Sequence, residues 1–139
     1  MVRTGEIVLK TTGNGQVLNI TEAVQSVVHD SGLRDGIVTV FCPSATSAVT
    51  TIEYESGAVR DFQRLFDQIV PSDQEYLHNY RWGDDNGHSH VRAALLGPSL
   101  TVPFVAGRLA LGTWQQIVFV DFDVRSRQRR LIVQMIGEA

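Results

Sequence analysis

The chain has 139 residues, 43% of them hydrophobic and 19% charged, a balance typical of one folded domain and unlike that of disordered or fibrous chains. Its 12 basic and 15 acidic residues give a formal net charge of −3, which offers no general attraction to nucleic acid or anionic lipid. The single cysteine, Cys42, excludes an internal disulfide, and no apolar run is long enough for a membrane span, so we expect a cytoplasmic protein.

The first half of the chain alternates strand and helix patterns. Strands are indicated by alternating apolar and polar residues or by runs rich in Val, Ile and Thr, and helices by apolar residues three and four positions apart. Asn19 or Thr21 would cap the first helix, and His29 near its end is expected to be solvated or capping. In chain order these patterns predict a strand at 6–11, a turn at 13–15, a helix from 19 to 32, strands at 36–43 and 47–52, and a helix from 56 that ends before Pro71.

The second half of the chain is mostly strand. Residues 72–89 are polar and aromatic without periodicity, and long connections of this kind are usually functional or mobile. A short helix is expected at Val91–Leu96, followed by strands at 99–105, 113–122 and 127–136. The whole pattern predicts a single α+β domain over residues 1–139 with mixed or antiparallel sheets. A doubly wound nucleotide-binding fold is disfavoured because no Gly-x-Gly-x-x-Gly follows the first strand.

Residues 76–90 concentrate potential ligands, among them His78, His88 and His90. Zinc prefers imidazole nitrogen, and a catalytic zinc site uses three protein ligands and leaves one position open. His88 and His90 would lie on one side of an extended backbone but nearly opposite each other on a helix, so joint ligation requires that residues 87–89 precede the next helix. A divalent metal site, metal-free acid–base use and an inert loop all remain open.

A hydroxyl-rich strand at 44–52 ends in two carboxylates and follows Cys42, which we expect to be a buried packing residue. Glu53 could act as a general acid or base or complete a metal site, while Thr50 and Thr51 could hydrogen-bond an anionic ligand. The alternative is that these hydroxyls face solvent on an edge strand and that the glutamates cap the following helix.

Arginines gather near the end of the chain. In the last strand Arg127 and Arg129 share one face, and their planar guanidinium groups could hold a phosphate at the rim of the sheet. Pairing of these arginines with Asp121 and Asp123 across a hairpin is the alternative.

Two motifs carry a family resemblance. Residues 84–97, DDNGHSHVRAALLG, and residues 107–123, GRLALGTWQQIVFVDFD, resemble the YjbQ family of small, largely uncharacterised proteins. The TTIEYESG segment and the closing Arg-x-Arg fit the same pattern, so the resemblance covers nearly the whole chain. It implies a sandwich-like α+β fold of sheets flanked by helices, a homotrimer, and a histidine-lined pocket at the subunit boundary. Some members are described as having a weak, secondary thiamine-phosphate synthase activity.

The resemblance also assigns site residues. The family's histidine motif falls on His88 and His90, its tyrosine-to-histidine motif on Tyr76 and His78, and its acidic residues on Asp85 and Glu53. The site expected from all these features binds a small phosphorylated metabolite. In it His78, His88 and His90 hold a divalent metal such as zinc, Glu53, Asp85 and His88 carry the acid–base chemistry, and Thr50, Thr51, Asn86, Arg127 and Arg129 hold the phosphate.

One motif departs from the family pattern. Many members have a His-Thr-Thr run after the proline, whereas Pro43 is followed here by Ser44-Ala45-Thr46. We therefore expect either an enzyme similar to thiamine-phosphate synthase or a non-catalytic trimer that binds a metabolite or metal without the same reaction.

Overall fold

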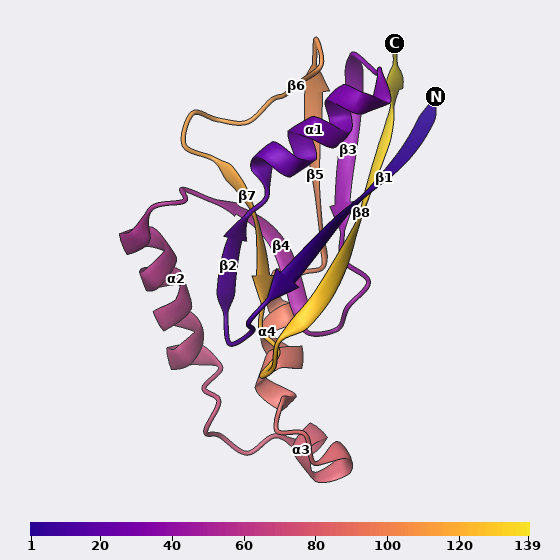
Figure 1. The fold of residues 1–139 in the computed structure, drawn as a ribbon. Coiled ribbons are helices and arrows are strands. Elements are labelled where there is room, and N and C mark those ends of the chain that lie inside the picture. Colours follow the sequence, from indigo (N-terminus) through magenta and orange to yellow (C-terminus); the bar gives the residue numbers. More distant parts are fainter.

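The computed structural model describes all 139 residues and confirms an α+β fold built from two antiparallel sheets and four helices (Figure 1). The larger sheet has the strand order β1-β8-β3-β5-β6, and the smaller sheet has the order β2-β7-β4. In chain order the elements are β1 (Val2–Thr11), β2 (Gln16–Asn19), α1 (Thr21–Ser31), β3 (Asp35–Phe41), β4 (Ser47–Ile52), α2 (Ser56–Ile69), α3 (Leu77–Trp82), α4 (Gly87–Leu96), β5 (Ser99–Val105), β6 (Arg108–Leu109), β7 (Gln116–Asp121) and β8 (Arg127–Glu138).

The larger sheet buries one face under α1, which crosses it in Figure 1. In β8 the buried positions are Leu131, Val133 and Met135, and the intervening residues point to the other face, as the two-residue period of a strand requires. Val24 and Val28 of α1 pack against this apolar surface. The helix ends at Gly32, whose φ of 75° is the left-handed conformation that glycine adopts without strain.

The smaller sheet is buried on both faces and so joins two cores. Val49, Ile117 and Phe119 face α1 and the larger sheet. The opposite face packs against α2 and α4 in a second core that includes Phe66 and Phe122, whose ring centroids lie 4.9 Å apart. Strands buried on both sides are nearly continuous apolar runs, and this explains the IVFV sequence of β7.

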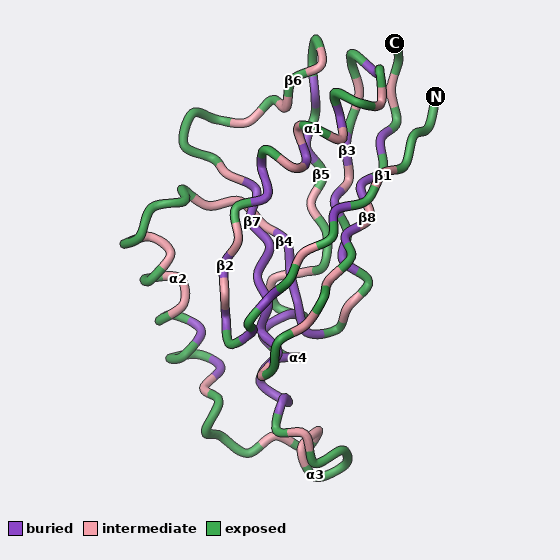
Figure 2. The backbone as a smooth tube through the Cα atoms, viewed as in Figure 1, coloured by how far each residue is buried: buried purple, intermediate pink, exposed green.

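The outer face of the larger sheet has no helix over it, because α2 and α4 pack against the smaller sheet and α3 lies against α4. Val8, Ile37, Phe41 and Ile136 are exposed there, and the strand register places Ile37 beside Ile136. Figure 2 shows exposed and half-buried stretches along β1, β3 and β8. None of the four helices has the length and apolar character needed to span a membrane.

Several boundaries differ from those expected from the sequence. The helix predicted at Val91–Leu96 begins at Gly87, because its first turn buries polar side chains and therefore lacks an apolar period. The segment before it contains α3, and the short strands β2 and β6 were not predicted. The strands β3 and β4 follow one another in the sequence but belong to different sheets.

Candidate functional site

The first turn of α4 is a buried polar segment: residues 86–89 are all buried. Gly87 allows this turn to approach α3 closely, since a Cβ at this position would lie 2.5 Å from the Cβ of Tyr76. The Gly87 backbone N–H donates to Asn79 Oδ1 at 2.9 Å. The sequence thus fixes a helix start against α3 and directs its polar residues inward.

Two polar atoms in this turn have no hydrogen-bond partner in the chain: Nδ1 of His88 and Oγ of Ser89. His88 is 5% exposed and Ser89 is fully buried, so bulk water does not satisfy them. Burial lowers the pKa of His88, and the positive charge of Arg92 lowers it further, so the imidazole is neutral at pH 7. Buried polar groups nearly always have partners, and an unpartnered pair therefore points to a ligand, a water or another chain.

The rings of His78 and His90 lie together on the α3 side of the site, with centroids 4.2 Å apart. His78 Nδ1 is 3.6 Å from Asp84 Oδ1. Burial and the neighbouring His78 lower the pKa of His90. The structure therefore brings together two of the three predicted histidines and adds Asp84, which the sequence did not single out.

His88 does not join the other two histidines. Because α4 begins at Gly87, His88 and His90 are two positions apart on a helix and project about 200° apart. The condition that the sequence set for joint ligation is therefore not met. No group of three or more His, Cys, Asp or Glu side chains in the chain is arranged to hold a metal ion. The residues of one chain do not fit the three-histidine zinc site.

Asn86 connects this turn to the carboxylates around it. Its amide nitrogen lies 3.4 Å from Asp123 Oδ1, and with the amide turned over the nitrogen donates to Asp84 Oδ1 at 2.9 Å. Asp123 acts electrostatically on both His88 and His90. Asn86 and Asp123 therefore place the histidines beside the end of the smaller sheet, where β7 leads into β8.

A buried network of arginine and aspartate occupies that end. Arg129 donates from Nε and Nη2 to the two oxygens of Asp121, at 2.8 and 2.9 Å, and Asp121 is fully buried. The remaining donors of Arg129 bond to the hydroxyls of Ser44 and Thr46, and Thr11 donates to Asp121 at 2.6 Å. Hydrogen bonding to Asp121 raises the pKa of Arg129. These contacts engage Arg129 inside the protein and confirm the alternative of pairing across the hairpin.

Arg127 pairs with Asp123 through Nε and Nη2, at 3.2 and 3.0 Å, and leaves Nη1 without a partner in the chain. Burial alone would raise the pKa of Asp123, but the Val124 N–H, the Asn86 amide and Arg127 lower it below its ordinary value. Asp123 is thus an anion at pH 7. Of the two predicted phosphate-binding arginines, only Arg127 has a whole terminal nitrogen, Nη1, without a partner, because every guanidinium nitrogen of Arg129 donates within the chain.

The hydroxyl-rich strand contributes side chains to this buried network at one end only. Thr46 and Ser44 lie in the arginine network, and Ser47 donates to the thiol of Cys42 at 3.3 Å. Burial raises the pKa of Cys42, which is a packing residue as expected.

Glu53 lies beyond the opposite end of β4, about 20 Å along the strand from Ser47, and does not meet the histidines. Thr50 and Thr51 lie toward the same end of β4 as Glu53, where they pair with Val118 and Ile117 of β7. They therefore do not meet the histidines either. Glu55 caps α2 by accepting from two backbone N–H groups, as the alternative interpretation predicted. Asp85 is exposed with a φ of 55°, and its side chain makes no hydrogen bond. The predicted site residues thus separate into a group near the start of α4, which includes the histidines, and a group at the far end of β4, which includes Glu53.

Sequence reasoning missed Ser89 and Arg92, and Thr11 and Thr46 as members of the network. Arg92 is buried and is fixed by Val70 O at 2.9 Å and by Asp67 at 3.2 Å. Polar residues at positions where a helix should be apolar were the available signal.

Comparison with known proteins gives one family. A family model described as UPF0047 protein YjbQ-like matches residues 5–138. A UPF0047 protein from Methanothermobacter thermautotrophicus is 41% identical over 137 residues, covering 99% of this chain and 94% of the relative. The UPF0047 protein YugU of Bacillus subtilis is 33% identical, covering 93% and 96%.

Solved structures agree with the sequence relatives. A hypothetical protein from Aeropyrum pernix K1 has a TM-score of 0.91 at 33% identity, covering 98% of this chain and 99% of that one. A YbjQ-like protein of unknown function from Sulfolobus solfataricus has a TM-score of 0.90 at 28% identity, covering 99% and 100%.

Proposed function

The chain belongs to the UPF0047 protein YjbQ-like family, and we propose that it binds a small phosphorylated molecule at the first turn of α4 and acts on it by acid–base chemistry. One observation carries this proposal: the buried His88 Nδ1 and Ser89 Oγ have no partner in the chain. The positive end of a ten-residue helix and a buried hydroxyl together favour a bound anion.

Four side chains would divide the work. Ser89 Oγ–H and the free Nη1 of Arg127 donate hydrogen bonds to phosphate oxygens, and the start of α4 adds its partial positive charge. Neutral His88 accepts or returns a proton at a substrate hydroxyl or amine. Asp123, an anion in contact with Arg127, keeps that guanidinium in place. These steps use only side chains of the chain and require no metal.

The test is calorimetric titration of the metal-stripped protein with inorganic phosphate and with phenyl phosphate. His88→Gln and Ser89→Ala should each weaken binding about tenfold, because each removes one buried hydrogen bond to the ligand. Ser72→Ala, an exposed serine, is the matched control and should bind like the parent. Absence of binding, or equal affinity in all four proteins, would overturn the proposal.

His78→Gln distinguishes this site from a metal site. His78 lies with His90 and Asp84, away from His88, so its loss should leave phosphate affinity unchanged. If a divalent metal held by His78, His88 and His90 carries binding, His78→Gln and a chelator should each abolish it. That result would restore the zinc hypothesis in place of the metal-free one.

The family resemblance supplies a specific reaction to assay. Thiamine-phosphate synthase activity, which joins a pyrimidine methyl diphosphate to a thiazole phosphate, is the finer part of the proposal. Product formation above that of His88→Gln would support it.

A second candidate is binding without turnover, and Ser44 favours it. Ser44 stands where many family members are expected to have a histidine, and its hydroxyl accepts from Arg129 Nη1 at 2.8 Å. Because the Ser44 hydroxyl is bonded to Arg129, Ser44 does not supply the proton-transfer group that a histidine would. Phosphate binding with no turnover of any phosphorylated substrate would select this candidate.

We also propose the homotrimer that the resemblance implies. Its support is the outer face of the larger sheet, which exposes Ile37 and Phe41 without a helix to cover them. Such faces are often subunit interfaces. Ile37→Lys should reduce the mass measured by light scattering from three chains to one, whereas Leu65→Lys on the exposed side of α2 should leave it unchanged. A parent protein that is monomeric at all concentrations would contradict the trimer.

A further inference from the structure

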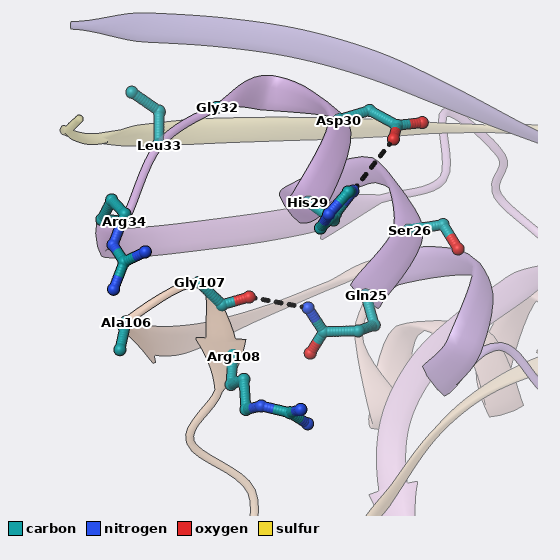
Figure 3. Close-up of a pocket in the computed structure, with 10 residues that line it drawn as sticks. All are labelled: Gln25, Ser26, His29, Asp30, Gly32, Leu33, Arg34, Ala106, Gly107 and Arg108. Atoms are coloured by element: carbon teal, nitrogen blue, oxygen red, sulfur yellow. Dashed lines mark hydrogen bonds and ion pairs between the residues drawn. The ribbon is translucent and has the colours of Figure 1, made fainter.

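A cavity of about 590 Å³ lies at the end of the molecule opposite α4. Its walls come from the last turn of α1, the loop that leads into β3, and the turn between β5 and β6 (Figure 3). Only two of its ten lining residues are hydrophobic, and the volume falls in the range of sites for small molecules. No predicted site residue lies here.

Two arginines, Arg34 and Arg108, line this cavity, and neither guanidinium has a hydrogen-bond or ion-pair partner in the chain. Five of the other nine arginines pair with carboxylates, namely Arg64, Arg92, Arg127, Arg129 and Arg130, whereas Arg3, Arg60, Arg81 and Arg125 do not. The two acidic residues nearest to Arg34 in sequence make contacts with other groups. Asp35 Oδ1 accepts from the Ala106 N–H at 3.0 Å, and Asp30 contacts His29 at 3.3 Å. Two guanidinium groups therefore line one cavity whose only carboxylate is that of Asp30.

The backbone that carries these arginines is held rigidly. Arg34 accepts from the Gly107 N–H at 2.7 Å and donates to Glu138 O at 2.7 Å. Gln25 of α1 clamps the β5–β6 turn with both ends of its amide, donating to Gly107 O at 2.8 Å and accepting from the Leu109 N–H at 3.0 Å. Figure 3 shows this clamp between the two arginines. A preorganised frame lowers the ordering cost of binding a ligand.

The turn itself leaves the cavity open. Ala106 and Gly107 both have positive φ, 51° and 79°, the geometry of a tight hairpin turn. A side chain at Gly107 or Gly32 would meet no atom within 4 Å, so open space adjoins the backbone at both positions. In Figure 3 the Asp30 carboxylate points away from the two arginines. The cavity is therefore open beside Gly32 and Gly107, and its lining carries more positive than negative charge.

We propose that this cavity is a second binding site, for a small ligand that carries more than one phosphate group, held by Arg34 and Arg108. Arginine binds phosphate oxygens through two parallel hydrogen bonds, and two arginines on separate walls favour a ligand with two anionic groups over a single phosphate. The site is independent of the one at α4, since it shares no residue with it.

The test is a titration of the ¹⁵N-labelled protein with inorganic pyrophosphate, followed by amide chemical shifts. Saturable shifts should appear at Gly32, Arg34 and Gly107. Arg34→Gln and Arg108→Gln should each weaken the affinity measured at these amides about fivefold, the upper range for an exposed ion pair. Arg60→Gln, an exposed arginine of α2, is the matched control and should have no effect.

The same spectra separate this proposal from the proposed function. Shifts at Gly87–His90 report the α4 site and can succeed or fail without those at Gly107. No saturable shift at Gly32, Arg34 and Gly107, or shifts that survive Arg34→Gln and Arg108→Gln unchanged, would overturn the second site. Both variants keep the backbone hydrogen bonds of the turn, and unchanged shifts elsewhere will confirm that they fold.

Discussion

Two buried polar regions adjoin at the end of the smaller sheet, and they differ in how their polar atoms are satisfied. Around Arg129 and Asp121 the charges and hydroxyls have partners within the chain. In the first turn of α4, which follows Asn86, His88 Nδ1 and Ser89 Oγ have none. Asp123 touches both regions, since it pairs with Arg127 and acts on His88.

This difference separates scaffold from site. A buried charge network that satisfies its own donors holds the strands β4, β7 and β8 in place and has little left to offer a ligand. Buried polar atoms without partners are costly to the isolated chain, and the cost is removed when a ligand binds. Of the arginines predicted to bind phosphate, Arg129 therefore belongs to the scaffold, and Arg127 belongs partly to the site.

The largest expected effect comes from breaking the satisfied region. Arg129→Met leaves the fully buried Asp121 without its bidentate partner and should destabilise the fold by about 3–5 kcal/mol, measured by urea denaturation. Arg130→Met is the control, because Arg130 faces the opposite side of β8 from Arg129 and pairs only with the exposed Glu6; its loss should cost less than about 1 kcal/mol. Equal effects of the two variants would mean that the network is not structural.

A smaller effect, of opposite sign in the two regions, is expected for hydroxyl removal. Thr46→Val removes a hydroxyl that accepts from Arg129 and donates to Asp123, and should cost about 1–3 kcal/mol. Ser89→Ala removes a buried hydroxyl without a partner and should stabilise the ligand-free chain by up to about 1 kcal/mol. Chemical denaturation of both variants in phosphate-free buffer measures this contrast. Destabilisation by Ser89→Ala would reveal an internal or intersubunit partner for Ser89.

The smallest effects are those of pH, and they should appear in separate windows. The folded-state pKa of His88 lies below its ordinary value of 6.5, so its contribution to stability is complete above pH 6.5 and is lost as the pH falls below it. The pKa of Asp123 lies below 3.8, so its contribution is lost only at more acidic pH. His88→Gln should therefore reduce the loss of stability between pH 7 and pH 5. Urea midpoints at the two pH values test this, and an unchanged slope in the variant would contradict it.

Much of the fold could be predicted from the sequence because apolar periodicity is strong there. The α1 and α2 helices and the strands β3, β4, β5 and β8 lie within a few residues of their predicted positions. The pairing of Arg129 with Asp121 was one of two stated alternatives, since the strand period places the arginine on the buried face. What the sequence could not indicate is which strands share a sheet, because short turns such as Pro43–Ala45 can redirect the chain.

The site was harder to predict for a physical reason. The first turn of α4 buries polar groups, so the apolar pattern that defines the rest of the helix is missing there, and the helix was predicted to begin four residues late. That error also led to the predicted three-histidine metal site, because His88 and His90 lie on the same side of the backbone only when the backbone is extended. Whether Glu53 lies near the histidines depends on the direction in which β4 runs within its sheet, and no local sequence pattern shows that direction.

The most direct test of the central claim is ¹⁵N NMR of the histidine rings during titration with inorganic phosphate. The account predicts that the Nδ1 resonance of His88 shifts in a saturable way, while those of His78 change little, and that Ser89→Ala weakens the response about tenfold. A His88 resonance that does not move under saturating phosphate, or one that moves equally in Ser89→Ala, would contradict a ligand site at the first turn of α4.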